Sequence, residues 1–265
     1  EPVAELRAAG ETWPARFADL IADADVFGKG VTWALRYETS LATNDVALLK
    51  KALTRGLARA DALLDAKRPW SLRNGKVLRG FVSAVDGSTQ PCGVIIPKSY
   101  DGTKPMRLDV VLHGSSKPVG MSELKFIARF DEGDDDEKSA PDVDFIELHP
   151  LGRVENCYRW AGETDVFEAI EAVCRNYKID RDRIVLRGLD RNKVILDGRY
   201  QLENGVKVID ANGVAVENMT ARRYERNGFF WTGAKGYRGS YLTSTRTGDY
   251  GIRVRLGRRL VRSRL

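Results

Sequence analysis

The sequence predicts an α/β protein in which a partial parallel sheet is followed by a short stack of repeated coils. Apolar segments with strand character alternate with helix-length connections between residues 107 and 188, which is typical of a parallel sheet. From about residue 189, glycines and apolar residues instead recur every 23 residues. We therefore predict a helical lead-in at 1–70, a sheet domain at 71–188, repeats at 189–252 and an arginine-rich tail at 253–265.

Two helices are predicted in residues 13–67. Apolar residues recur at helical spacing in both, at Phe17, Leu20, Ile21 and Ala24 and again at Val46, Leu49, Leu53, Leu57 and Ala60. We expect residues 28–30 (GKG) to interrupt the pattern, Asn44 or Asp45 to cap the second helix, and Pro69 to lie just beyond its end. Packing in the core is the expected role of these helices.

A β-hairpin and three parallel strands are predicted next. The hairpin joins residues 77–82 to 93–97 through an Asp86-Gly87 turn. Strands are expected at 108–112, 145–148 and 184–186, with helices between them at 123–130 and 166–177. Asp165 and Glu168 have the spacing of a capping box, so the second of these helices is expected to begin there.

The repeat is visible as three columns of residues. The columns are Leu196, Met219 and Leu242, then Gly205, Gly228 and Gly251, then Val206, Phe229 and Ile252. A period of this length indicates about three coils, each packed on its neighbours. We expect the glycines to form tight corners with positive φ and the apolar residues that follow them to point into the stack.

Composition and charge exclude few classes of function. The chain has 265 residues, 43% of them apolar, enough for a sizeable core. It has no apolar run of about 18 residues that could cross a membrane, and residues 1–30 lack the order of a signal peptide. Six arginines at 253–265 account for the net charge of +6. No aromatic platform accompanies them, so a nucleic-acid partner is not expected.

No metal site, cofactor site or disulfide is predicted. The cysteines Cys92, Cys157 and Cys174 are odd in number and have neither C-x-x-C spacing nor paired histidines, so buried thiols are expected. The acidic run at 131–137 lacks the alternating ligand spacing of a calcium loop. A solvated loop is expected there.

Residues 107–188 resemble α/β-hydrolases of the prolyl-oligopeptidase and esterase type. The resemblance rests on residues 108–114 (LDVVLHG), 145–153 (FIELHPLGR), 158–165 (YRWAGETD) and 180–186 (DRDRIVL), and with the lead-in it covers residues 1–188. It implies that the loop at His113 and Gly114 supplies an oxyanion-hole N–H near Ser115 or Ser116. It also implies an ester or peptide substrate and a secreted or periplasmic location, although the compartment is otherwise unknown.

The chain departs from this family where the nucleophile is due. A G-x-S-x-G turn should follow the strand at 184–186, but Gly188 is followed by residues 189–192 (LDRN). The base histidine should come later still, yet both histidines, His113 and His149, precede this point. Ser115 or Ser116 beside His149 is an alternative pair, but strand-end histidines with structural partners are the favoured interpretation. No catalytic residue is therefore identified.

Residues 189–252 resemble right-handed parallel β-helix proteins, which include polysaccharide lyases and carbohydrate-binding proteins of the cell surface. The resemblance rests on residues 189–198 (LDRNKVILDG), 213–221 (GVAVENMTA), 227–233 (NGFFWTG), 236–241 (GYRGSY) and 246–251 (RTGDYG). It implies an exposed coil face for a glycan, for which Arg223, Arg246 and Asp249 are candidates. A solvated coil surface is the alternative interpretation of these residues.

The sequence thus favours a hydrolase-like protein that is catalytically incomplete. The alternative is a carbohydrate-binding or polysaccharide-processing module of the cell envelope. We also expect the truncated front sheet to leave one strand edge open.

Overall fold

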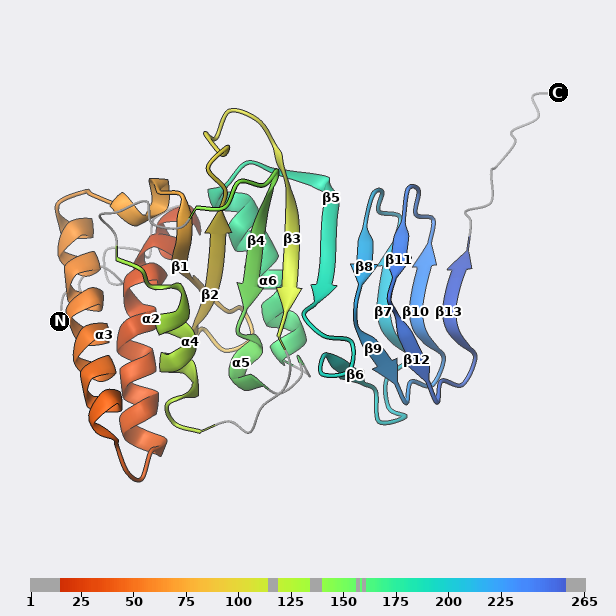
Figure 1. The fold of residues 1–265 in the computed structure, drawn as a ribbon, viewed down its shortest axis with the longest axis horizontal. Helices are drawn as coiled ribbons and strands as arrows, with labels where there is room; N and C mark the ends of the chain where they lie inside the picture. Colours follow the sequence, from red (N-terminus) through yellow and green to blue (C-terminus); the bar gives the residue numbers. More distant parts are fainter. Residues whose placement is uncertain (1–14, 114–118, 134–139, 156–157, 159–160, 256–265) are drawn as a thin grey trace.

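The fold is a mixed α/β structure whose main sheet is mostly parallel (Figure 1). The computed structural model describes residues 15–113, 119–133, 140–155, 158 and 161–255. Two long helices, α2 (Ala15–Tyr37) and α3 (Thr43–Leu64), are followed by the short η2 (Pro69–Leu72). The hairpin strands β1 (Gly75–Val82) and β2 (Thr89–Ile96) pair antiparallel, as predicted. In the described residues no helix is long and apolar enough to cross a bilayer.

The main sheet has the order β1-β2-β4-β3-β5-β8-β11. From β4 onward its strands are parallel: β4 (Phe145–Pro150), β3 (Met106–Leu112), β5 (Ile179–Gly188), β8 (Ala215–Glu217) and β11 (Arg238–Ser240). The three strands predicted at 108–112, 145–148 and 184–186 are the centre of this sheet. The expectation of an open edge is wrong, because β5 pairs with β8 from the repeat region.

Helices cover the two faces of the sheet at different places. On one face α6 (Ala161–Asn176) packs on the central strands, and Val110, Leu148 and Val166 share one core cluster. On the other face α2 and α4 (Ser122–Phe130) cover β1 and β2. A side chain at Gly93 would overlap the Phe130 ring, so this glycine permits the close approach of α4. The short α5 (Gly152–Glu155) follows β4.

The C-terminal strands form two further parallel sheets. One contains β6 (Ile195–Asp197), β9 (Thr220–Arg222) and β12 (Thr243–Thr245), and the other β7 (Asn204–Ile209), β10 (Asn227–Thr232) and β13 (Tyr250–Arg255). Asn204 pairs with Asn227 and Asn227 with Tyr250, each 23 residues further on. The same interval joins β8 to β11 and β9 to β12.

The expected role of the repeat glycines is wrong. Gly205, Gly228 and Gly251 lie inside β7, β10 and β13 and are not among the positive-φ residues. A side chain at Gly205 would instead overlap the backbone of Gly228, so close approach between successive strands requires glycine. Of the apolar residues that follow, Phe229 is fully buried and Val206 packs on the core, whereas Ile252 in the edge strand β13 is 52% exposed.

Positive φ angles occur elsewhere in the repeat and follow its period. Tyr200, Arg223 and Arg246 have φ of 59°, 55° and 55°, and Asn218 and Tyr241 have 56° and 51°. Each set is spaced by 23 residues, so the same backbone conformation recurs at the interval of the repeat. These positions hold non-glycine residues, which explains why glycine spacing did not locate them.

Two predictions for the lead-in are wrong. The glycines at 28 and 30 do not interrupt α2, because one or two glycines cost only about 1 kcal/mol each in a helix that is held by packing. A side chain at Gly30 would lie 2.8 Å from Ile127 Cδ1, so this position lets α4 approach α2. In α3, Leu49 and Ala60 are buried as predicted. Leu53 and Leu57 are exposed instead, and the buried face is completed by Ala52, Gly56 and Leu63.

The helix starts also differ from the prediction. Ala42 is the N-cap residue of α3, and Asp45 accepts a hydrogen bond from the Ala42 N–H at 3.2 Å. The helix predicted to begin at Asp165 begins at Ala161. Asp165 therefore does not cap it, and its carboxylate accepts a hydrogen bond from Arg153 Nε at 2.9 Å instead.

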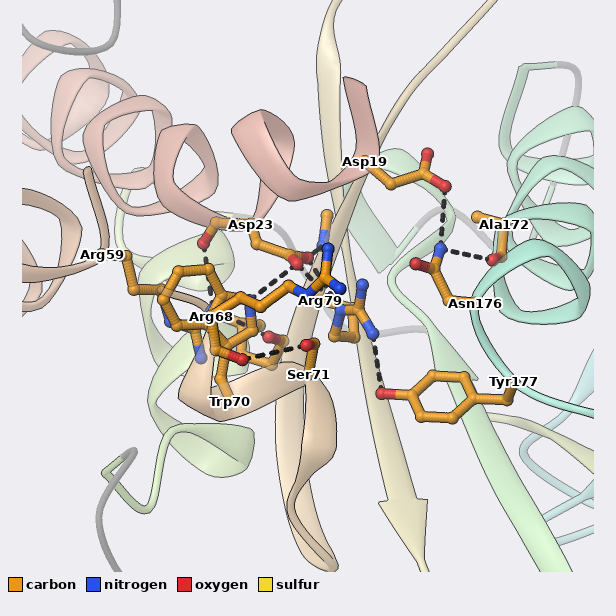
Figure 2. Close-up of polar contacts among 12 residues, drawn as sticks. Asp19, Asp23, Arg59, Arg68, Trp70, Ser71, Arg79, Ala172, Asn176 and Tyr177 are labelled. Carbon is orange, nitrogen blue, oxygen red and sulfur yellow. Dashed lines mark hydrogen bonds and ion pairs between the residues drawn. The ribbon is translucent and has the colours of Figure 1, made fainter. Parts of the chain in front are cut away.

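A buried polar cluster joins the lead-in to the sheet (Figure 2). The Asp23 carboxylate accepts hydrogen bonds from Arg79 Nε at 2.9 Å, Trp70 Nε1 at 2.8 Å and the Gly80 N–H at 2.7 Å. Arg79 also donates to Tyr177 Oη at 2.7 Å. One carboxylate thereby joins α2, η2 and β1, and through Arg79 it reaches the segment after α6.

A second ionic cluster joins the sheet to the repeat region. Asp109 on β3 is fully buried between Arg107 and Arg187, each at 2.8 Å. Arg187 on β5 also contacts Glu217 on β8 at 3.3 Å. The charged row therefore crosses the main sheet from β3 to β8.

Candidate functional site

A cavity of about 750 Å³ lies between α2, the β1–β2 turn and the segments that follow the carboxyl ends of β3 and β4. Its walls are α2, the β1–β2 turn with the start of β2, the start of α4 with the residues before it, and Arg153 just after β4. We call it the carboxyl-edge cavity. Its volume is within the range of about 300–1,000 Å³ that is usual for small-molecule sites. Open α/β sheets bind their ligands at this edge.

A buried ion pair forms one wall of the cavity. Lys29 Nζ lies 3.0 Å from Glu123 Oε1, and both side chains are mostly buried. Lys29 also donates to Gln90 Oε1 at 3.3 Å. Burial raises the pKa of Glu123, and the neighbouring charge of Lys29 opposes this rise. The pair therefore places a cation and an acid of raised pKa at the cavity surface.

Arg153 forms the opposite wall and links three carboxyl-edge segments. Its backbone has φ of 65°, which is rare for a residue with a side chain. Its guanidinium donates to Asp165, to Asp86 in the hairpin turn and to Ser83 Oγ at 2.6 Å. Hydrogen bonds from Arg153 and Ser88 hold the pKa of Asp86 well below its usual range.

Asp165 behaves differently from Asp86 although it shares the same arginine. Its side chain is almost fully buried, and Oδ2 has no hydrogen-bond partner among the described residues. Burial raises the pKa of Asp165 to about 6, against the opposing effect of Arg153. A carboxyl group that titrates near neutrality therefore lies directly behind the cavity wall.

Two stacked aromatic side chains give the cavity an apolar lip. The rings of Trp33 and Tyr37 are 4.7 Å apart and inclined by 18°, and both are exposed. Asp25, Lys29, Trp33 and Tyr37 recur every four residues along α2, which places them on one side of the helix. This spacing is visible in the sequence, but the apolar pattern of the helix predicts only its core-facing side.

The residues predicted for an oxyanion hole are only partly described. His113 Nε2 donates to the Leu151 carbonyl at 2.9 Å, and the His113 N–H donates to Tyr158 Oη at 2.9 Å. Gly114, Ser115 and Ser116 lie outside the described residues. His149 Nε2 contacts Glu147 Oε2 at 3.0 Å, and its ring lies beside Phe130. Both histidines thus have structural partners at the ends of β3 and β4.

The position due to carry a nucleophile is a turn into the repeat region. The Leu189 N–H donates to the Leu112 carbonyl, and Asp190 Oδ1 accepts from the Asn192 N–H at 2.9 Å before β6 begins. A side chain at Gly188 would overlap the backbone of Asn218. This turn therefore packs closely on the backbone at Asn218 and holds no serine.

The candidate glycan-contacting residues lie on the repeat but have different surroundings. Arg223 forms an ion pair with the buried carboxylate of Asp197, and hydrogen bonds from Arg223 and Arg222 hold the pKa of Asp197 well below its usual range. Arg246 and Asp249 are exposed. Arg223 and Arg246 both have positive φ, and the Arg223 N–H donates to the carbonyl of Thr245, the residue before Arg246.

Comparison with known proteins gives weak structural likeness to hydrolases. No protein-family model and no curated protein matches the chain. Among solved structures, FphF, a fluorophosphonate-binding serine hydrolase of Staphylococcus aureus, has a TM-score of 0.28 and 17% identity over 44% of this chain and 47% of its own. Oligopeptidase B of Leishmania major has a TM-score of 0.28 and 14% identity over 43% of this chain and 16% of its own. A ferulic acid esterase of Anaeromyces mucronatus has a TM-score of 0.27 and 13% identity over 43% of this chain and 49% of its own.

The similar structures are thus serine hydrolases, esterases and peptidases. This chain spans about half of their length or less. At these scores the likeness carries no inference about activity, which must come from the cavity itself.

Proposed function

We propose that this protein is hydrolase-like and binds an ester- or peptide-type molecule in the carboxyl-edge cavity without forming an acyl-enzyme. The observation that carries the proposal is the buried Lys29–Glu123 pair in a cavity beside the segments that follow the carboxyl ends of β3 and β4. A ligand site at this edge agrees with the general behaviour of open α/β sheets.

The chemistry of the walls suits a carbonyl-containing ligand. Lys29 and Arg153 supply hydrogen-bond donors, and Gln90 supplies an amide that can both donate and accept. Trp33 and Tyr37 offer apolar area to a side chain or an ester group of the ligand. The cavity therefore combines a few polar groups with an apolar lip, as binding sites usually do.

The absence of a serine in the turn after β5 supports binding without covalent catalysis. Acyl transfer by a serine hydrolase needs a hydroxyl activated by an adjacent base. Residues 188–192 (GLDRN) contain no hydroxyl side chain, and both histidines precede this turn.

A fluorophosphonate probe and a ligand panel test this proposal together. We expect no covalent labelling and no hydrolysis of p-nitrophenyl acetate, with a catalytically competent serine esterase as the positive control. N-acetyl amino-acid amides and methyl esters should bind, as followed by NMR, and Trp33→Ala should weaken their binding at least tenfold. Tyr200→Ala, an exposed aromatic on the repeat, is the control. Stoichiometric labelling by the fluorophosphonate, or ligand affinity that Trp33→Ala leaves unchanged, would overturn the proposal.

A second candidate function rests on the repeat region. We propose that residues 189–252 are coils of a parallel β-helix and that an exposed coil face binds a glycan. The 23-residue strand pairing and the repeated positive φ at Tyr200, Arg223 and Arg246 support it. Glycan-array binding that is lost in Arg246→Ala and kept in Trp33→Ala would favour this function, and absence of glycan binding would contradict it.

A further inference from the structure

A second cavity, of about 280 Å³, lies where the repeat region meets α6. α6 lies behind the main sheet in Figure 1, and this cavity is bounded by α6, the strands β3, β5 and β8, and the first strands of the repeat, β6 and β7. It shares no lining residue with the carboxyl-edge cavity. We call it the junction cavity.

The interior of the junction cavity is aliphatic. Its walls include Val110 and Leu186 from the sheet, Ile170 from α6, and Leu196 and Val206 from the repeat. These residues belong to the main core cluster or pack against it, so the cavity continues the core. Aliphatic walls of this kind favour the binding of an apolar chain.

The mouth of the junction cavity has a different character. Phe167 on α6 and Leu202 before β7 line it and are 61% and 47% exposed. Glu163, in the first turn of α6, also lines the cavity, and its side chain is exposed. The other carboxylate on the wall, Asp197, is already paired with Arg222 and Arg223. Lys207 on β7 also lines the cavity, but it alternates with the buried Val208, so its exposed side chain points to the other face of the strand. Glu163 is therefore the charged group that a ligand head meets at the mouth.

We propose that the junction cavity binds the aliphatic chain of an amphiphile whose head, an alcohol or an ammonium group, donates a hydrogen bond to Glu163. The chain lies among the aliphatic side chains of the sheet and of β7. The head stays at the mouth, where the carboxylate disfavours an anionic group.

The position of Val206 gives the sharpest test of chain binding. Val206 packs on the cavity from β7, whereas Ile209 on the same strand is 54% exposed and does not line it. Val206→Phe fills the cavity, and Ile209→Phe adds an aromatic ring on the same strand outside it. Val206→Ala enlarges the cavity and remains informative if the phenylalanine variant fails to fold.

Titration calorimetry with 1-octanol, 1-decanol, decylamine and decanoate tests the proposal. We expect decanol and decylamine to bind the wild-type protein and decanoate to bind at least tenfold more weakly. Val206→Phe should lose at least tenfold in decanol affinity, Ile209→Phe should lose none, and Val206→Ala should shift the preferred chain to a longer alcohol.

The head is tested by Glu163→Gln, which should remove most of the preference for decylamine over decanoate. Glu171→Gln on the same helix is its control. No measurable binding of any chain, or binding that Val206→Phe and Val206→Ala leave unchanged, would overturn the proposal. Because the ligand panel and variants do not touch the carboxyl-edge cavity, failure here leaves the proposed function standing.

Discussion

Replacing Asp23 by alanine is expected to destabilise the protein severely. Asp23 is fully buried, and its carboxylate is the shared acceptor for Arg79, Trp70 and the Gly80 N–H. Burial opposes the charge on Arg79, but Asp23 and Tyr177 together raise the pKa of Arg79 above its ordinary value. Without Asp23, Arg79 therefore keeps a charge that is buried and no longer balanced.

The magnitude follows from these contacts. Breaking a buried ion pair by removing one partner costs about 3–5 kcal/mol, and each buried donor left without an acceptor costs about 1–3 kcal/mol. These contributions overlap, so we expect a loss of at least about 4 kcal/mol in the free energy of unfolding. This is a large share of the roughly 5–15 kcal/mol that holds a typical domain folded.

Urea unfolding followed by circular dichroism measures the loss. Asp23→Ala/Arg79→Met should be more stable than Asp23→Ala, since the double variant removes the unbalanced charge. Glu171→Ala, which breaks the exposed pair with Arg181, should change stability by no more than about 1 kcal/mol. A loss below about 1 kcal/mol in Asp23→Ala, or a double variant less stable than Asp23→Ala, would refute the reasoning.

Three further predictions concern pH and glycine positions. The pKa of Asp165 is raised from 3.8 to about 6, so the folded state binds its proton more tightly than the unfolded state does. The contribution of Asp165 to the free energy of unfolding therefore falls as the pH rises from about 4 to 6. Asp165→Asn should flatten that fall, by roughly 2 kcal/mol, in urea titrations across this range. Gly228→Ala should lower the thermal midpoint more than Gly251→Ala. A methyl group at Gly228 would overlap both the Ser244 side chain and the Gly251 carbonyl, whereas one at Gly251 would meet only the Ser244 side chain. Equal shifts of the midpoint would contradict this. Gly28→Ala in α2 meets no atom within 4 Å and should stabilise the protein by about 0.5–1 kcal/mol in the same melts, whereas a lower midpoint would show an unrecognised contact.

The sequence predicted the main strands well because their signals are local. The apolar segments at 108–112, 145–148 and 184–186 form β3, β4 and β5, and the Asp86-Gly87 turn joins β1 to β2. The strands β8 and β11 carry no comparable signal, since residues 215–217 (AVE) and 238–240 (RGS) are short and mixed. Their place in the main sheet depends on pairing with residues far away in the chain. The prediction of an open edge is wrong because the sequence gives no local signal that β8 pairs with β5.

The candidate site was harder to predict than the fold. The resemblance drew attention to His113 and the residues after it, whereas the cavity walls come from α2, the hairpin turn and Arg153. Lys29 and Glu123 are 94 positions apart in the sequence, and only the packing of α2 on α4 brings their charges together. The buried Arg59 shows the same limit, because no pattern in the sequence predicts an arginine of α3 buried between the rings of Phe27 and Trp70.

The double role of β5 has a consequence for how this architecture can vary. β5 pairs on one side with β3 and on the other with β8, so the two halves meet along a single strand. β8 pairs with β11 at an interval of 23 residues, the interval that also joins β9 to β12, so we expect that a unit of this length can be added after β11 with no change at β5. Every residue that lines the carboxyl-edge cavity precedes β5, so a change in the number of repeated units leaves the lining of that cavity intact.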